Sequence, residues 1–251
     1  MSLNNVSLII TAGSRPGYLK HLLNGIARYL PETTTIVVND DENHPSWFNL
    51  PPKTIWEQTK PDTFLTRKRN LGVQLADTKY SLLLADDFLI DSNARRTVIR
   101  MVNILDSYDN IDVISGTYND RRYEGFLEVV KGEYIREHQL EDDEYNKIGP
   151  NISKVDISTN FFLARTKLLT KVPWDETIGP IGGEHADWFL DVKAARGVVA
   201  WTPGLNIYEQ EKNKDMESLD YRAKRARALE GHNLMLKKRG VKRYIGFGEQ
   251  P

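Results

Sequence analysis

The feature that most constrains the fold is an alternation of short apolar runs with longer segments of helical periodicity. Three of the runs in the first half end in polar or glycine-containing turns. The expected elements are strands over 6–11, 33–38, 80–85 and 111–115, and helices over 19–30, over 65–76 and after a cap at Ser92. Strands that alternate with helices indicate right-handed βαβ units and a mostly parallel sheet. The sequence therefore predicts an α/β fold whose central sheet is flanked by helices.

The second half of the chain has weaker periodicity. The elements expected there are an exposed loop or hairpin over 133–144, a strand over 155–163, a loop over 174–183, a helix over 184–196, a strand over 198–201 and a charged helix from about Ser218 to Arg239. Gly240 is expected to end that last helix. Because 251 residues suit one large domain and no repeat or flexible linker interrupts them, we expect a single compact unit.

Charge is distributed unevenly along the chain. The 34 Lys and Arg against 35 Asp and Glu give a net charge of −1, which argues against a dedicated nucleic-acid binder. The segment from Lys212 to Arg243 holds eleven basic and four acidic residues, a net +7, so the remainder carries −8. This basic segment has three interpretations: a solvated helix, a cover over an anionic ligand, or a peripheral contact with an anionic membrane surface.

Several protein classes are excluded by what the sequence lacks. The chain has no cysteine, which excludes disulfides and thiolate metal sites. No apolar run approaches the roughly 20 residues of a membrane span, and no secretory signal is visible. We therefore expect a soluble, cytoplasmic protein. The P-loop, the Gly-x-Gly-x-x-Gly fingerprint and the Gly-x-Ser-x-Gly elbow are also missing, which excludes P-loop kinases, ordinary dehydrogenases and typical α/β-hydrolases.

Three predicted strands end in the polar turns Thr11–Gly17, Asn39–Glu42 and Ala85–Phe88. Ligands of such sheets bind beyond the carboxyl ends of the strands, so we expect the three turns to share one rim. In the third turn, the adjacent carboxylates of Asp86 and Asp87 are suited to a hard divalent cation that bridges phosphate oxygens. The alternative is a solvated turn in which Asp87 helps to cap the next helix.

Two further motifs are suited to a nucleotide. A carboxylate of Asn39-Asp40-Asp41 can accept hydrogen bonds from a nucleobase or a ribose, although these residues are also common in turns. Residues 66–70 place three cations at the expected start of a helix, where an anion such as a diphosphate is favoured. The alternative for this segment is a solvated basic turn.

The segment Gly182–Asp187 opens a predicted helix. Glu184 and Asp187 share a face of that helix with Asp191. The helix N-terminus keeps a nearby carboxylate ionised and suited to act as a base, and the alternative is simple capping by acids. His185 is a metal ligand, a group that orients a carboxylate, or a half-buried side chain.

Taken in order, these motifs resemble the nucleotide-sugar glycosyltransferases of the GT-A fold. The likeness is to the inverting, family-two-like group that includes the animal β1,4-N-acetylgalactosaminyltransferases. It covers about residues 5–210 and is carried by RNLGVQLADTKYSLLLADDFLI (Arg69–Ile90), NFFLARTKLLTKVPWDETI (Asn160–Ile178) and EHADWFLD (Glu184–Asp191). The resemblance implies one glycosyltransferase domain over 1–251, with a nucleotide-binding half (5–115), an acceptor and catalytic half (116–210) and a basic C-terminal helix and tail (211–251).

The resemblance also implies roles for single residues. Nucleotide contacts are implied for Thr11, Ala12, Arg15, Asp40, Arg69, Asn70 and Asp86. Asp87 matches the metal ligand of the Asp-x-Asp motif, whose first carboxylate is replaced by Ala85. Glu209 stands where a metal-binding His follows the last strand in relatives. Two candidates for the catalytic base are Glu184 and Asp187, of which Asp187 is slightly favoured. The implied acceptor site contains Trp174, Asp175, Gly182, Gly183 and His185, with core packing as the alternative for Trp174.

The activity implied is metal-dependent, inverting transfer of GalNAc, GlcNAc or galactose from a UDP-sugar to a glycan or glycolipid hydroxyl. Mn²⁺ or Mg²⁺ is the expected cofactor, because the carboxylate rim would otherwise repel an anionic nucleotide. One alternative is a non-catalytic module that binds nucleotide sugars or glycans. A sugar nucleotidyltransferase is the other alternative, and the lack of a Gly-rich signature near the first strand argues against it.

Overall fold

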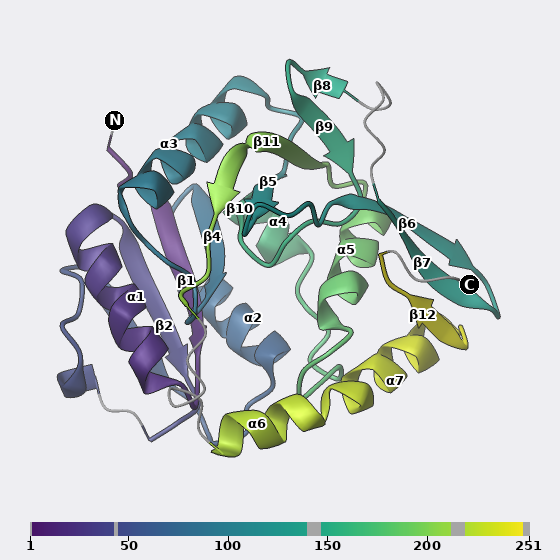
Figure 1. Ribbon diagram of the computed structural model, residues 1–251, viewed down its shortest axis with the longest axis horizontal. Coiled ribbons are helices and arrows are strands. Elements are labelled where there is room, and N and C mark those ends of the chain that lie inside the picture. The colour runs from purple at the N-terminus through teal and green to yellow at the C-terminus, as the bar shows by residue number, and fades with distance from the viewer. Residues whose placement is uncertain (1, 43–44, 140–146, 212–218, 248–251) are drawn as a thin grey trace.

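The computed structural model describes residues 2–42, 45–139, 147–211 and 219–247 (Figure 1). Its strands are β1 (Val6–Ala12), β2 (Thr34–Asn39), β3 (Thr54–Gln58), β4 (Tyr80–Ala85), β5 (Val113–Tyr118), β6 (Gly125–Val130), β7 (Tyr134–Gln139), β8 (Lys147–Gly149), β9 (Ile152–Val155), β10 (Phe162–Arg165), β11 (Val199–Ile207) and β12 (Arg243–Ile245). The α-helices are α1 (Pro16–Tyr29), α2 (Leu65–Leu75), α3 (Ser92–Ser107), α4 (Thr166–Lys171), α5 (Glu184–Ala194), α6 (Leu219–Ala226) and α7 (Ala228–Arg239), with a 3₁₀ turn at Pro45–Trp47.

The central sheet of the described chain has the strand order β3-β2-β1-β4-β10-β5-β11-β9-β8. Strands β10 and β9 are antiparallel to both of their neighbours, while the remaining seven strands run in one direction. The prediction of an α/β fold around a mostly parallel sheet is therefore confirmed. The carboxyl ends of β1, β2 and β4 meet at one edge, which is where the three polar turns emerge.

The central strands are apolar because both faces of the sheet are covered. All seven residues of β1 are buried. Its Leu8 and Ile10 pack with the side chains of α1 and α3 in one core cluster. Ile9 points the opposite way and packs with Val73 of α2 and Trp188 of α5 in the other cluster. Alternation along one strand thus assigns α1 and α3 to one face of the sheet and α2, α4 and α5 to the other (Figure 1).

A second sheet, with the order β12-β7-β6, stands beside the first. Strands β6 and β7 form an antiparallel hairpin, and β12 returns from the C-terminus to pair parallel with β7. The connection to β12 is made by α6 and α7, and α7 packs against α5 (Figure 1). The C-terminal segment therefore closes the molecule below the carboxyl ends of the parallel strands.

Several boundaries differ from the sequence-based prediction. Residues 155–163 belong to two strands, because the chain leaves β9 and crosses to β10 on the far side of β5 and β11. The charged C-terminal helix is interrupted at Arg227, which leaves helical geometry (ψ 6°). Asp91, rather than Ser92, caps α3 through bonds from the backbone N–H groups of Asn93 and Ala94.

Other expectations are met or lie outside the described residues. Gly240 ends α7 in the left-handed conformation (φ 65°), as predicted. Part of the acidic segment forms β7, so the hairpin interpretation is correct for residues 134–139, whereas residues 140–144 and Ser218 lie outside the description. Strands β3, β6, β8 and β12 were not predicted. Among the described residues, every helix is too short or too polar to cross a bilayer.

Candidate active site

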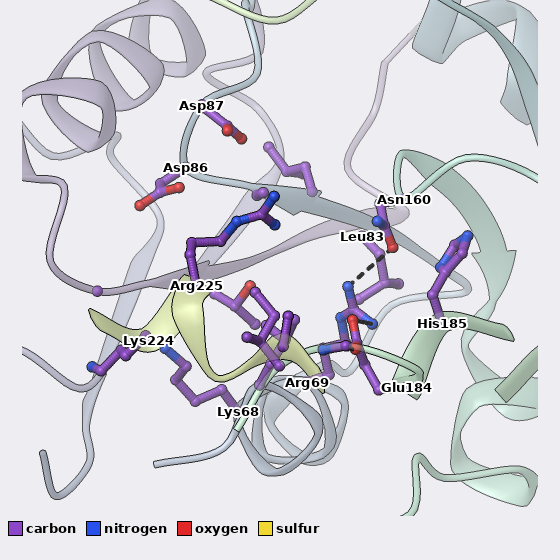
Figure 2. A pocket seen from close by; sticks show the side chains of 18 of the residues that line it. Lys68, Arg69, Leu83, Asp86, Asp87, Asn160, Glu184, His185, Lys224 and Arg225 are labelled. Carbon is purple, nitrogen blue, oxygen red and sulfur yellow. Dashed lines mark hydrogen bonds and ion pairs between the residues drawn. The ribbon is translucent and has the colours of Figure 1, made fainter. Parts of the chain in front are cut away.

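A cavity of about 760 Å³ opens at the carboxyl ends of β1, β2 and β4. Residues of all three predicted turns line it, including Thr11, Asp40 and Asp86, so the expected common rim is confirmed. Helices α2 and α5, which cover the face of the sheet opposite α1 and α3, add further lining residues. The other lining helices are α6 and α7 of the C-terminal segment. Figure 2 shows Asp86 and Asp87 on one side of this cavity and Glu184 and His185 on the other.

The Asp86-Asp87 pair is held by one arginine. The guanidinium of Arg15 donates from Nη1 to Asp87 Oδ2 at 2.7 Å and from Nε to Asp86 Oδ2 at 3.4 Å, while Nη2 donates to Asp86 Oδ1. Burial nevertheless raises the pKa of Asp86 to about 6, because the loss of hydration outweighs the attraction of Arg15. The turn after β1 and the turn after β4 are thereby joined through charge.

Asp40 is almost fully buried and is bonded on both carboxylate oxygens. Lys68 Nζ lies 2.8 Å from Oδ1 and also donates to the Ala12 carbonyl, which anchors α2 to the rim. Lys224 of α6 reaches Oδ2 at 3.1 Å, so the basic C-terminal segment touches the predicted nucleoside site. Burial lowers the pKa of Lys68, and the attraction of Asp40 offsets part of that effect.

Glu184 lies at the far side of the cavity, at the first position of α5. Its Oε2 accepts a hydrogen bond of 2.7 Å from the Gly182 N–H, and its Oε1 lies 3.8 Å from Arg69 Nη1. The Arg69 Nη2 donates to Asn160 Oδ1 at 3.2 Å, the contact drawn in Figure 2. These contacts hold the Glu184 carboxylate in place among the residues that line the cavity.

The Gly182-Gly183 pair is required by the backbone. Both residues have positive φ, 95° and 79°, and residues that carry a Cβ seldom adopt such values. A Cβ at Gly182 would also lie 2.3 Å from the Ala228 carbonyl oxygen of α7. The two glycines therefore let the loop pass against α7 and turn into α5 with Glu184 at its start.

His185 lines the cavity next to Glu184. Its Nε2 lies 2.6 Å from the Ser158 carbonyl oxygen, an acceptor, so this nitrogen carries a proton. Burial, followed by the nearby Arg69 charge, lowers the pKa of His185 to about 4. The ring is consequently neutral at physiological pH, and of the three interpretations given above a half-buried, hydrogen-bonded side chain describes it.

Four predicted site residues are not among those that line the cavity. Asp187 is 1% exposed, and its oxygens lie 2.7 Å from Lys238 Nζ and 2.6 Å from Arg239 Nε. Of the two candidate bases, Glu184 therefore lines the cavity, whereas Asp187 lies under α7 and outside the lining. The cause is the pairing of α5 with α7, which the helical periodicity of α5 does not reveal.

The other three have packing roles. Trp174 is 3% exposed and stacks on Trp188 with ring centroids 4.6 Å apart, so the core-packing alternative is correct for it. Asn70 is buried and bonds the backbone of Trp174 through both ends of its amide. Asp175 binds Lys238 at 2.9 Å. These residues support the cavity wall from behind.

A divalent cation would find hard oxygen ligands at one place in the cavity. Asp87 and Glu209 are adjacent across the β4 and β11 exits, where the Gln210 N–H donates to the Asp87 carbonyl at 2.7 Å. Burial and then a bond with Glu209 raise the pKa of Tyr118 between them. Within the described ranges, no three His, Asp or Glu side chains are grouped to hold a metal. Two carboxylates fit Mg²⁺ or Mn²⁺ that takes its other ligands from phosphates and water.

Sequence reasoning missed part of the cavity lining. Lys224 and Arg225 belong to the C-terminal segment of net charge +7, and the sequence did not predict which of its residues line the cavity. Asn160 belongs to a segment that resembles the glycosyltransferases, but no role at the site was predicted for it. The lining also contains the aromatic residues Tyr118, Tyr123 and Phe247, and the last of these comes from a segment more than 100 residues away from the other two. Tyr123 is 39% exposed and meets the Tyr118 ring at 5.5 Å.

Comparison with known proteins supports the predicted resemblance. The chain is 26% identical over 216 residues to mouse "Beta-1,4 N-acetylgalactosaminyltransferase 2", covering 82% of this chain and 39% of that protein. It is 28% identical over 204 residues to human "Beta-1,4 N-acetylgalactosaminyltransferase 1", covering 74% and 36%. The chain thus spans less than two fifths of the length of these curated relatives. No protein-family model matches it.

Solved structures share the fold at lower sequence identity. S. aureus TarS has a TM-score of 0.59 at 14% identity, with 94% of this chain and 72% of that one covered. GalNAc-T7, solved with UDP, GalNAc and Mn²⁺, has a TM-score of 0.62 at 12% identity, with 90% and 47% covered. The predicted glycosyltransferase fold is therefore confirmed, and the chain resembles β1,4-N-acetylgalactosaminyltransferases in sequence.

Proposed function

We propose that the protein is a glycosyltransferase that moves a sugar from a UDP-sugar to a hydroxyl of a glycan or glycolipid. The observation that carries this proposal is one cavity that is lined both by cations, from the turn after β1, from α2 and from α6, and by a buried glutamate. Such cations suit a nucleoside diphosphate, and the glutamate suits an acceptor hydroxyl. The names of the curated relatives favour GalNAc as the transferred sugar, with GlcNAc and galactose as alternatives.

The donor nucleotide is assigned to the strand-end side of the cavity. Asp40, next to Thr11 and Ala12, would accept hydrogen bonds from the nucleoside. Lys68, Lys224 and the exposed Arg225 lie where the charge of a diphosphate needs to be balanced. Because charge grows on the leaving diphosphate as its bond to the sugar breaks, these cations would stabilise the transition state more than the bound donor.

Glu184 is the proposed general base. Its carboxylate is buried, lines the cavity and keeps an oxygen 3.8 Å from Arg69 Nη1. As the acceptor oxygen attacks the anomeric carbon, Glu184 would take its proton. A single in-line displacement leaves the new bond on the opposite face of the sugar ring, so the reaction would invert the anomeric configuration.

Asp87 and Glu209 are the proposed ligands of a divalent cation. When bound, Mn²⁺ or Mg²⁺ neutralises charge on the diphosphate. The solved GalNAc-T7 structure, which contains UDP, GalNAc and Mn²⁺, supports a metal and a UDP-linked donor for a protein of this fold. The protein's own contribution is to hold two carboxylates at the exits of β4 and β11, which the bond from the Gln210 N–H to the Asp87 carbonyl joins.

The acceptor is assigned to the aromatic wall formed by Tyr118, Tyr123 and Phe247. An aromatic face covers the apolar side of a pyranose ring, and Tyr123 exposes more than a third of its surface for such a contact. Ser158 also lines the cavity, and its buried hydroxyl has no hydrogen-bond partner among the described residues. Burial without a partner is costly, so this hydroxyl suits a sugar hydroxyl of the donor or acceptor.

A screen of UDP-sugars tests the proposal. Calorimetry with UDP-GalNAc, UDP-GlcNAc and UDP-galactose, each with Mn²⁺, should give binding for at least one donor. The same donor should be hydrolysed slowly without an acceptor and faster with one. Tight binding of UDP with no hydrolysis and no transfer would support the binding-module alternative, and release of pyrophosphate would support a nucleotidyltransferase.

A further inference from the structure

Arg15 occupies the carboxylate pair that the proposed function assigns partly to a metal. Its guanidinium spans Asp86 and Asp87 with three N–H groups, and its side chain and that of Asp86 are less than a tenth exposed. Arginine matches carboxylate and phosphate groups equally well, because its planar fork donates two parallel hydrogen bonds to either. The contact is therefore exchangeable for a phosphate in the same cavity.

We propose that Arg15 is an internal counterion that keeps divalent cations away from Asp86 and Asp87 until a diphosphate takes its guanidinium. The inference rests on the proposed function and extends it to the coupling between two ligands. A metal at Asp87 competes with Arg15, and so does a diphosphate, which competes with the carboxylates for the same N–H groups. Each ligand therefore removes the competitor of the other.

Charge explains why the exchange requires both ligands. If Arg15 left alone, two adjacent carboxylates would face each other with no cation between them, which is unfavourable at a buried site. If a metal entered alone, the guanidinium would be displaced from its partners while it remained largely buried against the Tyr18 ring, whose centroid lies 5.5 Å from Arg15 Cζ. A diphosphate that arrives with the metal satisfies both groups at once. Because coupling between two binding sites is reciprocal, the metal must tighten diphosphate binding by the same factor.

The test measures Mn²⁺ affinity without nucleotide, from the electron paramagnetic resonance signal of free Mn²⁺. Arg15→Met should bind Mn²⁺ at least tenfold more tightly than the wild type, because the competing cation is gone. Arg15→Lys, which cannot span both carboxylates, should give a smaller gain. Arg95→Met, which removes an arginine paired with Glu32 outside the cavity lining, should match the wild type. If Arg15→Met does not fold, Arg15→Lys carries the test, and a Mn²⁺ affinity equal to that of the wild type in either variant would overturn the inference.

A second arm uses UDP and inorganic pyrophosphate. Saturating UDP should tighten Mn²⁺ binding to the wild type. In Arg15→Met, UDP should tighten Mn²⁺ binding less, and the reduction should equal the factor by which the substitution itself tightens Mn²⁺ binding in the absence of nucleotide. Pyrophosphate without metal should bind Arg15→Met at least tenfold more weakly than the wild type, and unchanged binding would count against Arg15 as its partner. Failure of the proposed function would give a different result, because the wild type would then bind neither UDP nor UDP-sugars. The Mn²⁺ affinities measured without nucleotide would still test the role of Arg15.

Discussion

The two sides of the cavity are built by different physical means. On the strand-end side, charges lock the turns after β1, β2 and β4 to one another through Arg15 and Lys68, and each carboxylate has a cationic partner. Another part of the lining consists of the rings of Tyr118, Tyr123 and Phe247 and of the Ser158 hydroxyl, which has no partner among the described residues. The proposed donor site is thus prearranged by ion pairs, while the proposed acceptor site is shaped by rings and a hydroxyl group. We expect that substitutions can disable the charged side or the aromatic side separately.

Glu184 lies across the cavity from Asp86 and Asp87, and its substitution should have the largest effect. Glu184→Gln keeps the size and one acceptor oxygen but removes the proton acceptor, so transfer should fall by about 10²–10⁴-fold. The dissociation constant for UDP should stay within about threefold, because the nucleotide is assigned to the opposite side. Steady-state transfer rates and calorimetry measure the two quantities.

Asp187→Asn is the matched control on the same helix. It should lower the free energy of unfolding by about 3 kcal/mol, because Lys238 and Arg239 lose the charge that they share. Its transfer rate, measured below the unfolding temperature, should stay within about tenfold of the wild type. Loss of transfer in Asp187→Asn together with full activity in Glu184→Gln would reverse the assignment of the base.

Lys224→Met should disable the charged side alone. Removing this cation beside Asp40 should raise the dissociation constant for UDP about tenfold, equivalent to ~1.4 kcal/mol. The Michaelis constant for the acceptor should not change. Lys237→Met, an exposed lysine of α7 that does not line the cavity, is the control. Equal UDP affinity in Lys224→Met and Lys237→Met would remove α6 from the donor site.

Tyr123→Ala should disable the aromatic side alone. Loss of a stacking surface is worth about 1 kcal/mol, so the Michaelis constant for the acceptor should rise roughly fivefold. Hydrolysis of the UDP-sugar without acceptor should be unaffected, which separates acceptor binding from donor chemistry. Tyr134→Ala on β7 is the control, because that ring is not part of the lining. A slower hydrolysis rate in Tyr123→Ala would contradict the separation of the two sides.

The last prediction concerns the pH dependence of stability rather than either side of the cavity. Because the pKa of His185 is lowered to about 4, the folded protein keeps the ring neutral while the unfolded chain protonates it near 6.5. The stability from this group is fully present above pH 6.5 and is lost as pH falls towards 4. His185→Gln keeps a donor for Ser158 and cannot titrate. The difference in unfolding free energy between wild type and variant should fall by about 1–2 kcal/mol from pH 7 to 4.5, and chemical denaturation at each pH measures it.

The sequence predicted those parts of the fold that local pattern controls. Strands β1, β2 and β4 are buried on both faces and end in polar turns, so both their positions and the rim were readable. Strand β12 pairs with β7, more than 100 residues earlier in the chain, and nothing local signals that pairing. Long-range pairing therefore sets the limit of prediction for this half of the molecule.

The same limit applies within the site. Glu184 and Asp187 both carry a carboxylate and lie about one turn apart, yet one lines the cavity and the other is enclosed by Lys238 and Arg239. Which carboxylate is available depends on where α7 lies, not on α5. The partner of the Asp86-Asp87 pair was likewise hidden, because Arg15 is 71 residues away along the chain.

The loop at Gly182 and Gly183 touches α7 through backbone rather than side chains. A Cβ at Gly231 would lie 2.2 Å from the Gly182 carbonyl oxygen, so no flexible group separates the two segments. The loop and α7 are therefore in direct backbone contact, and the same loop supplies the Gly182 N–H that binds Glu184. The carboxylate at the start of α5 is thus positioned by the packing of α7 as well as by its own helix.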